Sequence, residues 1–257
     1  MSRKKQAAPK STSRYKLHFR KWHRRLGFLA AIFLLNLSIT GLLLNHYQSL
    51  SLHKNYITST LLLDWYGIKA PDSGVCLSKE PLSVCQIGEQ HYINGQYWKE
   101  TSSQLLLLEP SPIGLVLVTN EFVYWLTKTG QLIDALSIAD SLDTAATSAT
   151  QVNQQIYIQT LKGNYQLNEN TFQWEPVDII NFPQLTKEQL DGDQLSDLQE
   201  QYRSRQITQL KLVQDLHSGA IFGITGTLFT DIMALILIWL VISGFVTWYR
   251  RRSKTST

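Results

Sequence analysis

An uninterrupted apolar run near the amino terminus limits what this chain can fold into. From Leu26 to Leu44 the sequence has 19 consecutive residues without a charged side chain. As a helix this run is about 28 Å long, which matches the hydrocarbon core of a bilayer. A cleaved signal peptide has a shorter apolar core followed by small residues, whereas this run leads into Asn45, His46 and Tyr47. We therefore predict an uncleaved membrane-spanning helix over residues 26–46.

A second apolar stretch lies near the carboxyl terminus. Residues Ile232 to Tyr249 carry no charge. A less apolar but uncharged stretch from Ser218 to Thr230 precedes them, with Asp231 between the two. We predict a second spanning helix over residues 231–249. Residues 206–230 are expected to form a helical connector that contains a glycine-rich stretch.

The basic residues indicate how these two helices are oriented. Residues 1–25 contain ten lysines and arginines and no acidic residue, and residues 250–257 contain four more basic residues. The positive-inside rule therefore places both tails in the cytoplasm. Of the 24 basic and 20 acidic residues in the chain, 10 basic and all 20 acidic ones lie between the tails, which gives that segment a charge of about −10. The net charge of +4 is thus a topology signal, and it gives no support to nucleic-acid binding.

The segment between the apolar runs, residues 47–205, has the pattern of antiparallel β-structure. Short apolar or alternating runs are separated by turn residues, and they predict strands over Val84–Ile87, His91–Trp98, Gln104–Leu108, Gly114–Val118, Phe122–Leu126, Gln155–Thr160 and Asn164–Leu167. Ile93 to Gly95 mark a hairpin turn. The fold class predicted is a membrane α+β protein, in which two transmembrane helices flank a mostly antiparallel β domain on the far side of the membrane.

Two further features lie in this segment. Cys76 and Cys85 are nine residues apart, and in an oxidising compartment they would close a small disulfide loop, which we favour over two buried free thiols. An acidic cluster lies in a helix-forming stretch and is interpreted as a solvated helix face rather than as a cation site. Its members are Glu188, Asp191, Asp193, Asp197 and Glu200.

The histidines are the candidates for chemistry. Four of the six lie near the predicted spans, namely His18, His23, His46 and His217. Imidazole at such a place is an interfacial polar group, a proton relay or an axial ligand of haem iron, and position alone favours the first. His217 is followed by Gly219, Gly223 and Gly226, which would let a helix or a flat macrocycle come close to the backbone. The cations around His23 would pair with haem carboxylates or simply anchor the helix.

Distances measured along straight helices limit which of these histidines can bind the same haem. If Arg25 and Arg250 lie at equal depth, His46 faces Phe229, and His217 stands about 18 Å further out. One haem could then bind both histidines only if the glycine-rich stretch folds His217 back. The other arrangement takes ligands from two protomers, with His46 paired with its own copy across a two-fold axis and His23 likewise.

The same distances along the helices give the expected positions of His23 and Asp231. His23 lies about 35 Å along the helix from His46, so these two mark opposite faces of the membrane. Asp231 falls level with Leu44 at the outer edge of the membrane. There its carboxylate would accept a proton from a quinol or hold an imidazole N–H, or it would be a helix-entry charge facing water.

The residues around these histidines resemble a known family. One end of the chain reads Lys21-Trp22-His23-Arg24-Arg25-Leu26-Gly27 and leads into Thr40-Gly41-Leu42-Leu43-Leu44-Asn45-His46. The other end contains Leu216-His217-Ser218-Gly219, Phe222-Gly223, Ser243-Gly244 and Trp248 before the basic tail. In order and in polarity, both ends resemble the PepSY-associated transmembrane proteins.

The resemblance implies a bacterial inner-membrane protein with a periplasmic central domain. Studied members of the family include haem-containing reductases of ferric iron or ferric siderophores, and a small two-helix type supports ferrous iron uptake. The family's histidines fall on His23, His46 and His217. We therefore expect haem b as the cofactor, with His46 and His217 as axial ligands of the iron and His23 as a further ligand candidate.

Two functions remain open from the sequence. In the first, electrons pass from quinol to ferric iron or a ferric siderophore outside the membrane, since no flavin or nicotinamide motif is present, and two chains form a homodimer of four helices in the lipid. In the second, the chain is a non-enzymatic membrane anchor whose β domain binds a partner such as a transporter or an envelope protease.

Overall fold

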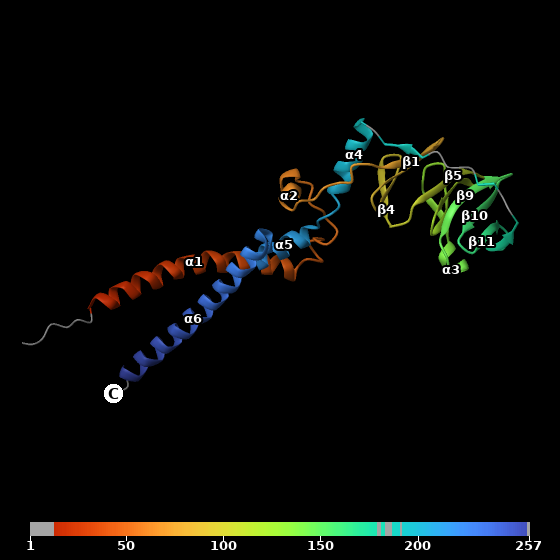
Figure 1. The fold of residues 1–257 in the computed structure, drawn as a ribbon. Helices are drawn as coiled ribbons and strands as arrows, with labels where there is room; N and C mark the ends of the chain where they lie inside the picture. Colours follow the sequence, from red (N-terminus) through yellow and green to blue (C-terminus); the bar gives the residue numbers. More distant parts are fainter. Residues whose placement is uncertain (1–12, 179–180, 183–186, 191, 256–257) are drawn as a thin grey trace, which may run out of the picture. The chain divides into compact units, whose positions relative to one another are not determined.

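The computed structural model describes residues 13–178, 181–182, 187–190 and 192–255 (Figure 1). The chain divides into two compact units. The helical unit contains residues 1–57 and 207–257, and the β unit contains residues 58–206.

The helical unit contains the two membrane spans. Its elements are α1 (Ser13–Asn45), α5 (Gln209–Ser218), the short 3₁₀ helix η1 (Ala220–Phe222) and α6 (Gly223–Thr255). The stretches long and apolar enough to cross a bilayer are Arg24–Asn45 and Ala220–Val246, and most of their side chains are exposed, as expected of helices that face lipid. The two spans predicted from the sequence are therefore present, although the second begins before Asp231.

A reversal of the chain separates α5 from α6. Gly219 ends α5 with a φ of 79°, and Gly223 begins α6 with a φ of 66°, both values that favour glycine. The backbone passes so close to itself that a Cβ on Gly226 would stand 2.0 Å from the carbonyl oxygen of Gly219. Because of this reversal, α5 packs against α1 instead of extending the line of α6.

The two spans contact each other at one level. The rings of Phe33 and Phe229 meet edge to face with centroids 6.3 Å apart, and Ala30 and Met233 are 2% and 1% exposed. Figure 1 shows α1 and α6 separating toward the chain termini. The prediction that Phe229 faces His46 is therefore wrong, because it assumed parallel, unbroken helices.

The β unit consists of three antiparallel sheets that follow one another along the chain. The first has the order β13-β1-β2-β3-β4, the second β5-β6-β7-β8 and the third β12-β11-β10-β9. The strands of the first sheet are β1 (Val75–Lys79), β2 (Leu82–Ile87), β3 (Gln90–Ile93), β4 (Gln96–Glu100) and β13 (Glu188–Gln189). Those of the second are β5 (Leu105–Ser111), β6 (Gly114–Thr119), β7 (Phe122–Leu126) and β8 (Leu132–Ser137). Those of the third are β9 (Ala146–Val152), β10 (Gln155–Thr160), β11 (Gly163–Asn168) and β12 (Gln173–Val177).

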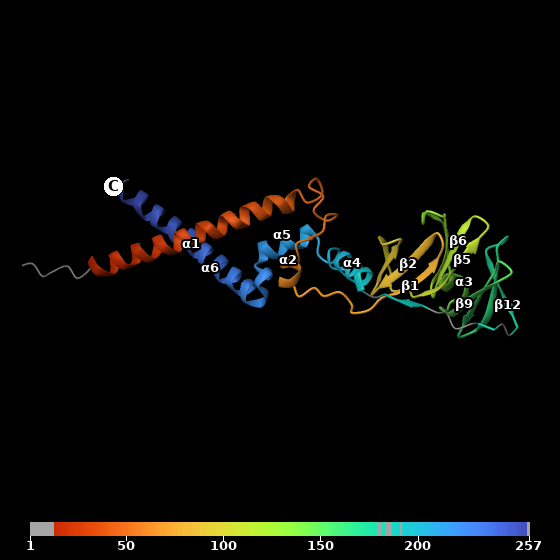
Figure 2. The same cartoon turned by 90° about the horizontal axis from the view of Figure 1, so that it is seen from above.

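Apolar side chains between these layers form the cores of the β unit. Figure 2 shows the three sheets in succession, with α4 (Gly192–Arg203) beside the first. One core lies between the first two sheets and another between the last two, while Leu190 and Leu198 cover the outer side of β1 and β2. Two short helices, α2 (Thr60–Trp65) and α3 (Ile138–Leu142), complete the unit. The predicted membrane α+β architecture is confirmed.

Candidate functional site

Two polar side chains of α1 hold the last turn of α5. Asn36 donates from Nδ2 to the carbonyl oxygen of Leu216 at 3.2 Å, and Thr40 Oγ1 lies 2.8 Å from Nδ1 of His217. The final carbonyls of a helix have no partner within it, so the amide of Asn36 satisfies a group that would otherwise be costly in lipid. Asn36 and Thr40 are one turn apart and share a face of α1. This contact places His217 beside the first span.

The hydroxyl of Thr40 also contacts its own helix. Oγ1 lies 2.7 Å from the carbonyl oxygen of Asn36 and 3.3 Å from that of Leu37. Such bonds to a preceding carbonyl are how threonine is accommodated in an apolar helix. Thr40 is 4% exposed, so water has little access to this hydroxyl.

The surroundings of His217 suit an imidazole that binds a metal. Within the described parts of the chain, the only hydrogen bond of its ring is the one at Nδ1, which leaves Nε2 without a partner. On α1, a Cβ at Gly41 would lie 3.9 Å from Cε1 of His217, so the ring packs next to this glycine. A metal-binding histidine usually has its other ring nitrogen fixed by a hydrogen bond, and His217 fits that pattern.

Among the described residues, His46 forms no hydrogen bond with His217 of the same chain, whose ring bonds to Thr40. It follows Thr40 by six residues, about 9 Å along a helix and about 120° around its axis. Its side chain is exposed, and it lies just past the end of α1. The glycine-rich stretch thus does fold His217 back toward the first span, where its ring contacts Thr40. The side chain of His23 lies outside the described residues.

Asp231 lies at a different depth from the one predicted. It follows Phe229 by two residues on α6, and Phe229 packs on Phe33, which precedes Leu44 by 11 residues on α1. The predicted placement of Asp231 beside Leu44, at the outer edge of the membrane, is therefore wrong, because it also assumed two parallel, unbroken helices. Asp231 is exposed, and no described residue forms a hydrogen bond or ion pair with it.

Sequence reasoning did not single out the polar residues that hold α5, Asn36 and Thr40. The signal that could have found them is the position of Asn36 in the middle of a span, since polar residues inside a membrane are rare and mark functional contacts. Asp215, which is 4% exposed and paired with Lys211, was also missed. Nothing in its spacing distinguishes it from an ordinary helical ion pair.

The first sheet of the β unit contains the two cysteines. Cys76 and Cys85 are directly opposite each other on β1 and β2, and a disulfide joins their sulfurs at 2.02 Å. Both are nearly buried among the residues that α4 covers. In the described part of the chain, no group of three or more histidine, cysteine or acidic side chains is arranged to hold a metal ion. Asp191 of the acidic cluster lies outside that part.

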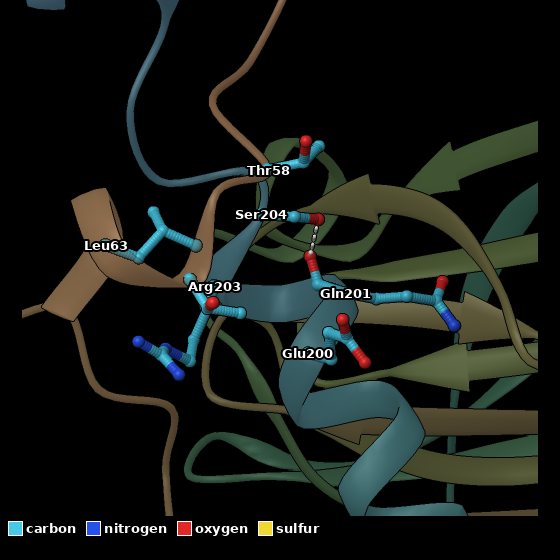
Figure 3. A pocket seen from close by; sticks show the side chains of 7 residues that line it. Thr58, Leu63, Glu200, Gln201, Arg203 and Ser204 are labelled. Carbon is cyan, nitrogen blue, oxygen red and sulfur yellow. Dashed lines mark hydrogen bonds between the residues drawn. The ribbon is translucent and has the colours of Figure 1, made fainter.

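A hollow between α2 and α4 is lined by polar residues, including Thr58, Glu200, Arg203 and Ser204 (Figure 3). The guanidinium of Arg203 is already paired with Asp64, and its Nε donates to the carbonyl oxygen of Ile68 at 3.0 Å. Ser204 donates to the carbonyl oxygen of Gln201 at 2.8 Å. Two of the lining side chains, Arg203 and Ser204, are therefore engaged in holding the fold.

A second polar cluster is enclosed between the first two sheets. Lys99 donates from Nζ to the hydroxyl of Tyr124 at 2.6 Å and lies over the rings of Trp98, Phe122 and Tyr124 at 5.2, 5.4 and 4.3 Å. Burial lowers the pKa of Lys99 and raises that of Tyr124 to about 12. An aromatic cage of this kind binds cations, but here the chain's own ammonium fills it.

His91 is opposite Lys99 on the neighbouring strand and faces the same way. It is fully buried, and neither ring nitrogen has a hydrogen-bond partner among the described residues. Burial lowers its pKa to about 4, and the charge of Lys99 adds to the effect, while the nearby backbone of Ser103 opposes it in part. His91 is thus held neutral inside a closed core, which makes it a determinant of stability.

Comparison with known proteins gives one result that covers nearly the whole chain. The family model of the PepSY-associated TM region matches residues 1–251. No curated protein and no solved structure matches significantly.

Proposed function

This chain belongs to the PepSY-associated transmembrane family, and on that premise we propose that it is an inner-membrane b-type haem protein. It passes electrons from quinol to ferric iron or a ferric chelate in the periplasm, and it thereby supports iron uptake. Both basic tails lie in the cytoplasm and the β unit lies in the periplasm, as the positive-inside rule favours.

The observation that carries the proposal is the environment of His217. Its ring is held against α1 through Nδ1 by Thr40, while Nε2 has no hydrogen-bond partner among the described residues. The fixed end of α5 holds the ring of His217 against α1, with its Cε1 next to Gly41. A b-type haem, when bound, supplies the one-electron chemistry that the side chains of this protein lack.

The second residue that would hold the haem iron is His46, supplied by a second copy of the chain. Thr40, the residue that contacts His217, and His46 would be about 120° apart around the axis if α1 continued regularly, so two copies related by a two-fold axis offer the simpler route to binding by both histidines. Four spanning helices then form the bundle in which such cofactors are usually held. His23 remains a further ligand candidate on the opposite side of the membrane.

Asp231 supports the same assembly. A carboxylate left in lipid near the middle of a span costs about 2.5–3.5 kcal/mol, so a contact with another helix or with water is favoured there. In the homodimer, Asp231 lies on a helix contact and is the candidate that accepts a proton from quinol. It acts at mid-span rather than at the outer edge of the membrane.

A visible absorption spectrum of the full-length protein, purified from haem-replete cells, tests the proposal. We expect a haem signal that dithionite reduces and ferric chelates reoxidise. His217→Ala and His46→Ala should each abolish or strongly alter this signal. His53 is an exposed histidine whose ring meets that of Tyr47 edge to face, and His53→Ala should leave the signal unchanged. A colourless preparation, or a normal spectrum in both ligand variants, would contradict the proposal.

The alternative is a membrane-anchored module whose β unit binds a protein partner. The observation that favours it is that the β unit makes up more than half of the chain and has its own apolar cores. A colourless protein that retains its fold would support this alternative.

A further inference from the structure

The hydroxyl of Thr40 links two helices, and its three close neighbours define where its proton lies. Oγ1 is 2.7 Å from the carbonyl oxygen of Asn36, 3.3 Å from that of Leu37 and 2.8 Å from Nδ1 of His217. A hydroxyl has one hydrogen to donate and two lone pairs that accept. The imidazole nitrogen and a carbonyl therefore compete for a single proton.

The shortest of these distances decides the competition. The separation of 2.7 Å between Thr40 Oγ1 and the carbonyl oxygen of Asn36 is the optimum for an O–H···O hydrogen bond. At this distance the two oxygens would repel each other if no hydrogen lay between them. The hydroxyl therefore donates to Asn36, as threonine commonly does in a helix. Its lone pair is left facing Nδ1 of His217, and this contact is favourable only if Nδ1 carries a hydrogen.

The proton on Nδ1 determines the state of the other ring nitrogen. A neutral imidazole has one N–H, so Nε2 then carries the lone pair. We infer that Thr40 is a positioning residue that holds His217 as the Nδ1–H tautomer and leaves Nε2 as the atom that binds a metal. That the metal is haem iron rests on the proposed function, whereas the tautomer rests on the hydrogen bonds alone.

Two features keep this arrangement in place. Asn36 binds the carbonyl oxygen of Leu216, the residue before His217, and so fixes the end of α5. Thr40 is buried, so a water molecule cannot easily replace its hydroxyl as the partner of the ring. A substitution that removes only the hydroxyl should therefore allow His217 to adopt either tautomer without moving α5.

The tautomer can be measured on the full-length chain without haem. Protein labelled with ¹⁵N-histidine, made in haem-deficient cells and held in detergent, would be studied by NMR, and the His217 signals would be assigned by their loss in His217→Ala. We expect a protonated Nδ1 and an unprotonated Nε2. Thr40→Val should shift the ring toward Nε2–H, and Thr40→Ser should retain the native pattern. A protonated Nε2 in the native protein, or no change in Thr40→Val, would overturn the inference.

Haem titration of the same variants separates this inference from the proposed function. Loss of the hydrogen bond that orients a metal ligand typically lowers metal affinity by about 10–100-fold, so Thr40→Val should bind haem more weakly by that factor and show a shifted midpoint potential. Thr40→Ser should restore both. If the native protein binds no haem while Nδ1 is protonated, the proposed function fails and the tautomer stands. If haem binds equally to all three proteins, the positioning role fails and the proposed function stands.

Discussion

Acidification should destabilise the β unit through a single histidine, His91. In the folded chain its pKa is about 4, compared with 6.5 for a free imidazole, because the charged ring would be buried without a hydrogen-bond partner. As the pH falls below 6.5, the unfolded chain takes up a proton at this residue before the folded chain does. The stability that neutral His91 contributes is therefore present above pH 6.5 and is lost as the pH falls toward 4.

The size of the effect follows from the two pKa values. Linkage between protonation and unfolding gives a loss of about 2 kcal/mol between pH 7 and pH 4.5, and the full shift corresponds to about 3 kcal/mol. Because a domain of this size is stable by only about 5–15 kcal/mol, the loss should be easy to measure.

The assay is urea unfolding of the full-length protein in detergent, followed by tryptophan fluorescence at both pH values. His91→Leu removes the titrating group, so between pH 7 and pH 4.5 the free energy of unfolding of this variant should fall by about 2 kcal/mol less than that of the native protein. Other groups titrate alike in both proteins and cancel in the comparison. His53→Leu, at an exposed histidine, should retain the native pH dependence. Equal pH dependence in His91→Leu and the native protein would refute the reasoning.

Three further predictions concern topology, the disulfide and the chain reversal. Reporter fusions at Thr58 or Thr147 should be active in the periplasm and fusions after Thr257 in the cytoplasm; a cytoplasmic signal at Thr147 would contradict the layout. Cys76 and Cys85 should resist thiol labelling under denaturing conditions until a reductant is added, because a disulfide joins them, and free thiols in protein from the native envelope would count against it. Gly226→Ala should destabilise the helical unit by about 1–3 kcal/mol, since its Cβ would stand 2.0 Å from the carbonyl oxygen of Gly219. Gly244→Ala, with nothing within 4 Å of the new Cβ, is the matched control, and equal thermal stability of both variants in detergent would exclude the steric argument.

The sequence by itself determined the features that depend on local pattern. A long run of apolar residues without a charge identifies a membrane-spanning helix whatever its tertiary contacts are, and both predicted spans are present. Alternation and turn residues located β7 at Phe122–Leu126 and β10 at Gln155–Thr160 with their observed bounds. The hairpin at Asn94 and Gly95 was also correct, because both residues adopt the positive φ that such a turn needs.

Only the tertiary structure decided which residues of the two spans meet. The assumption of straight helices predicted that Phe229 lies next to His46, whereas in the structure Phe229 packs on Phe33. The backbone torsions of Gly219 and Gly223 turn α5 back, and no periodicity in the sequence encodes the direction of that turn. The same reversal brings His217 to Thr40, a contact between residues 177 positions apart that depends on how two helices pack. Helix packing is set by side chains from both partners at once, so it cannot be predicted from either segment alone.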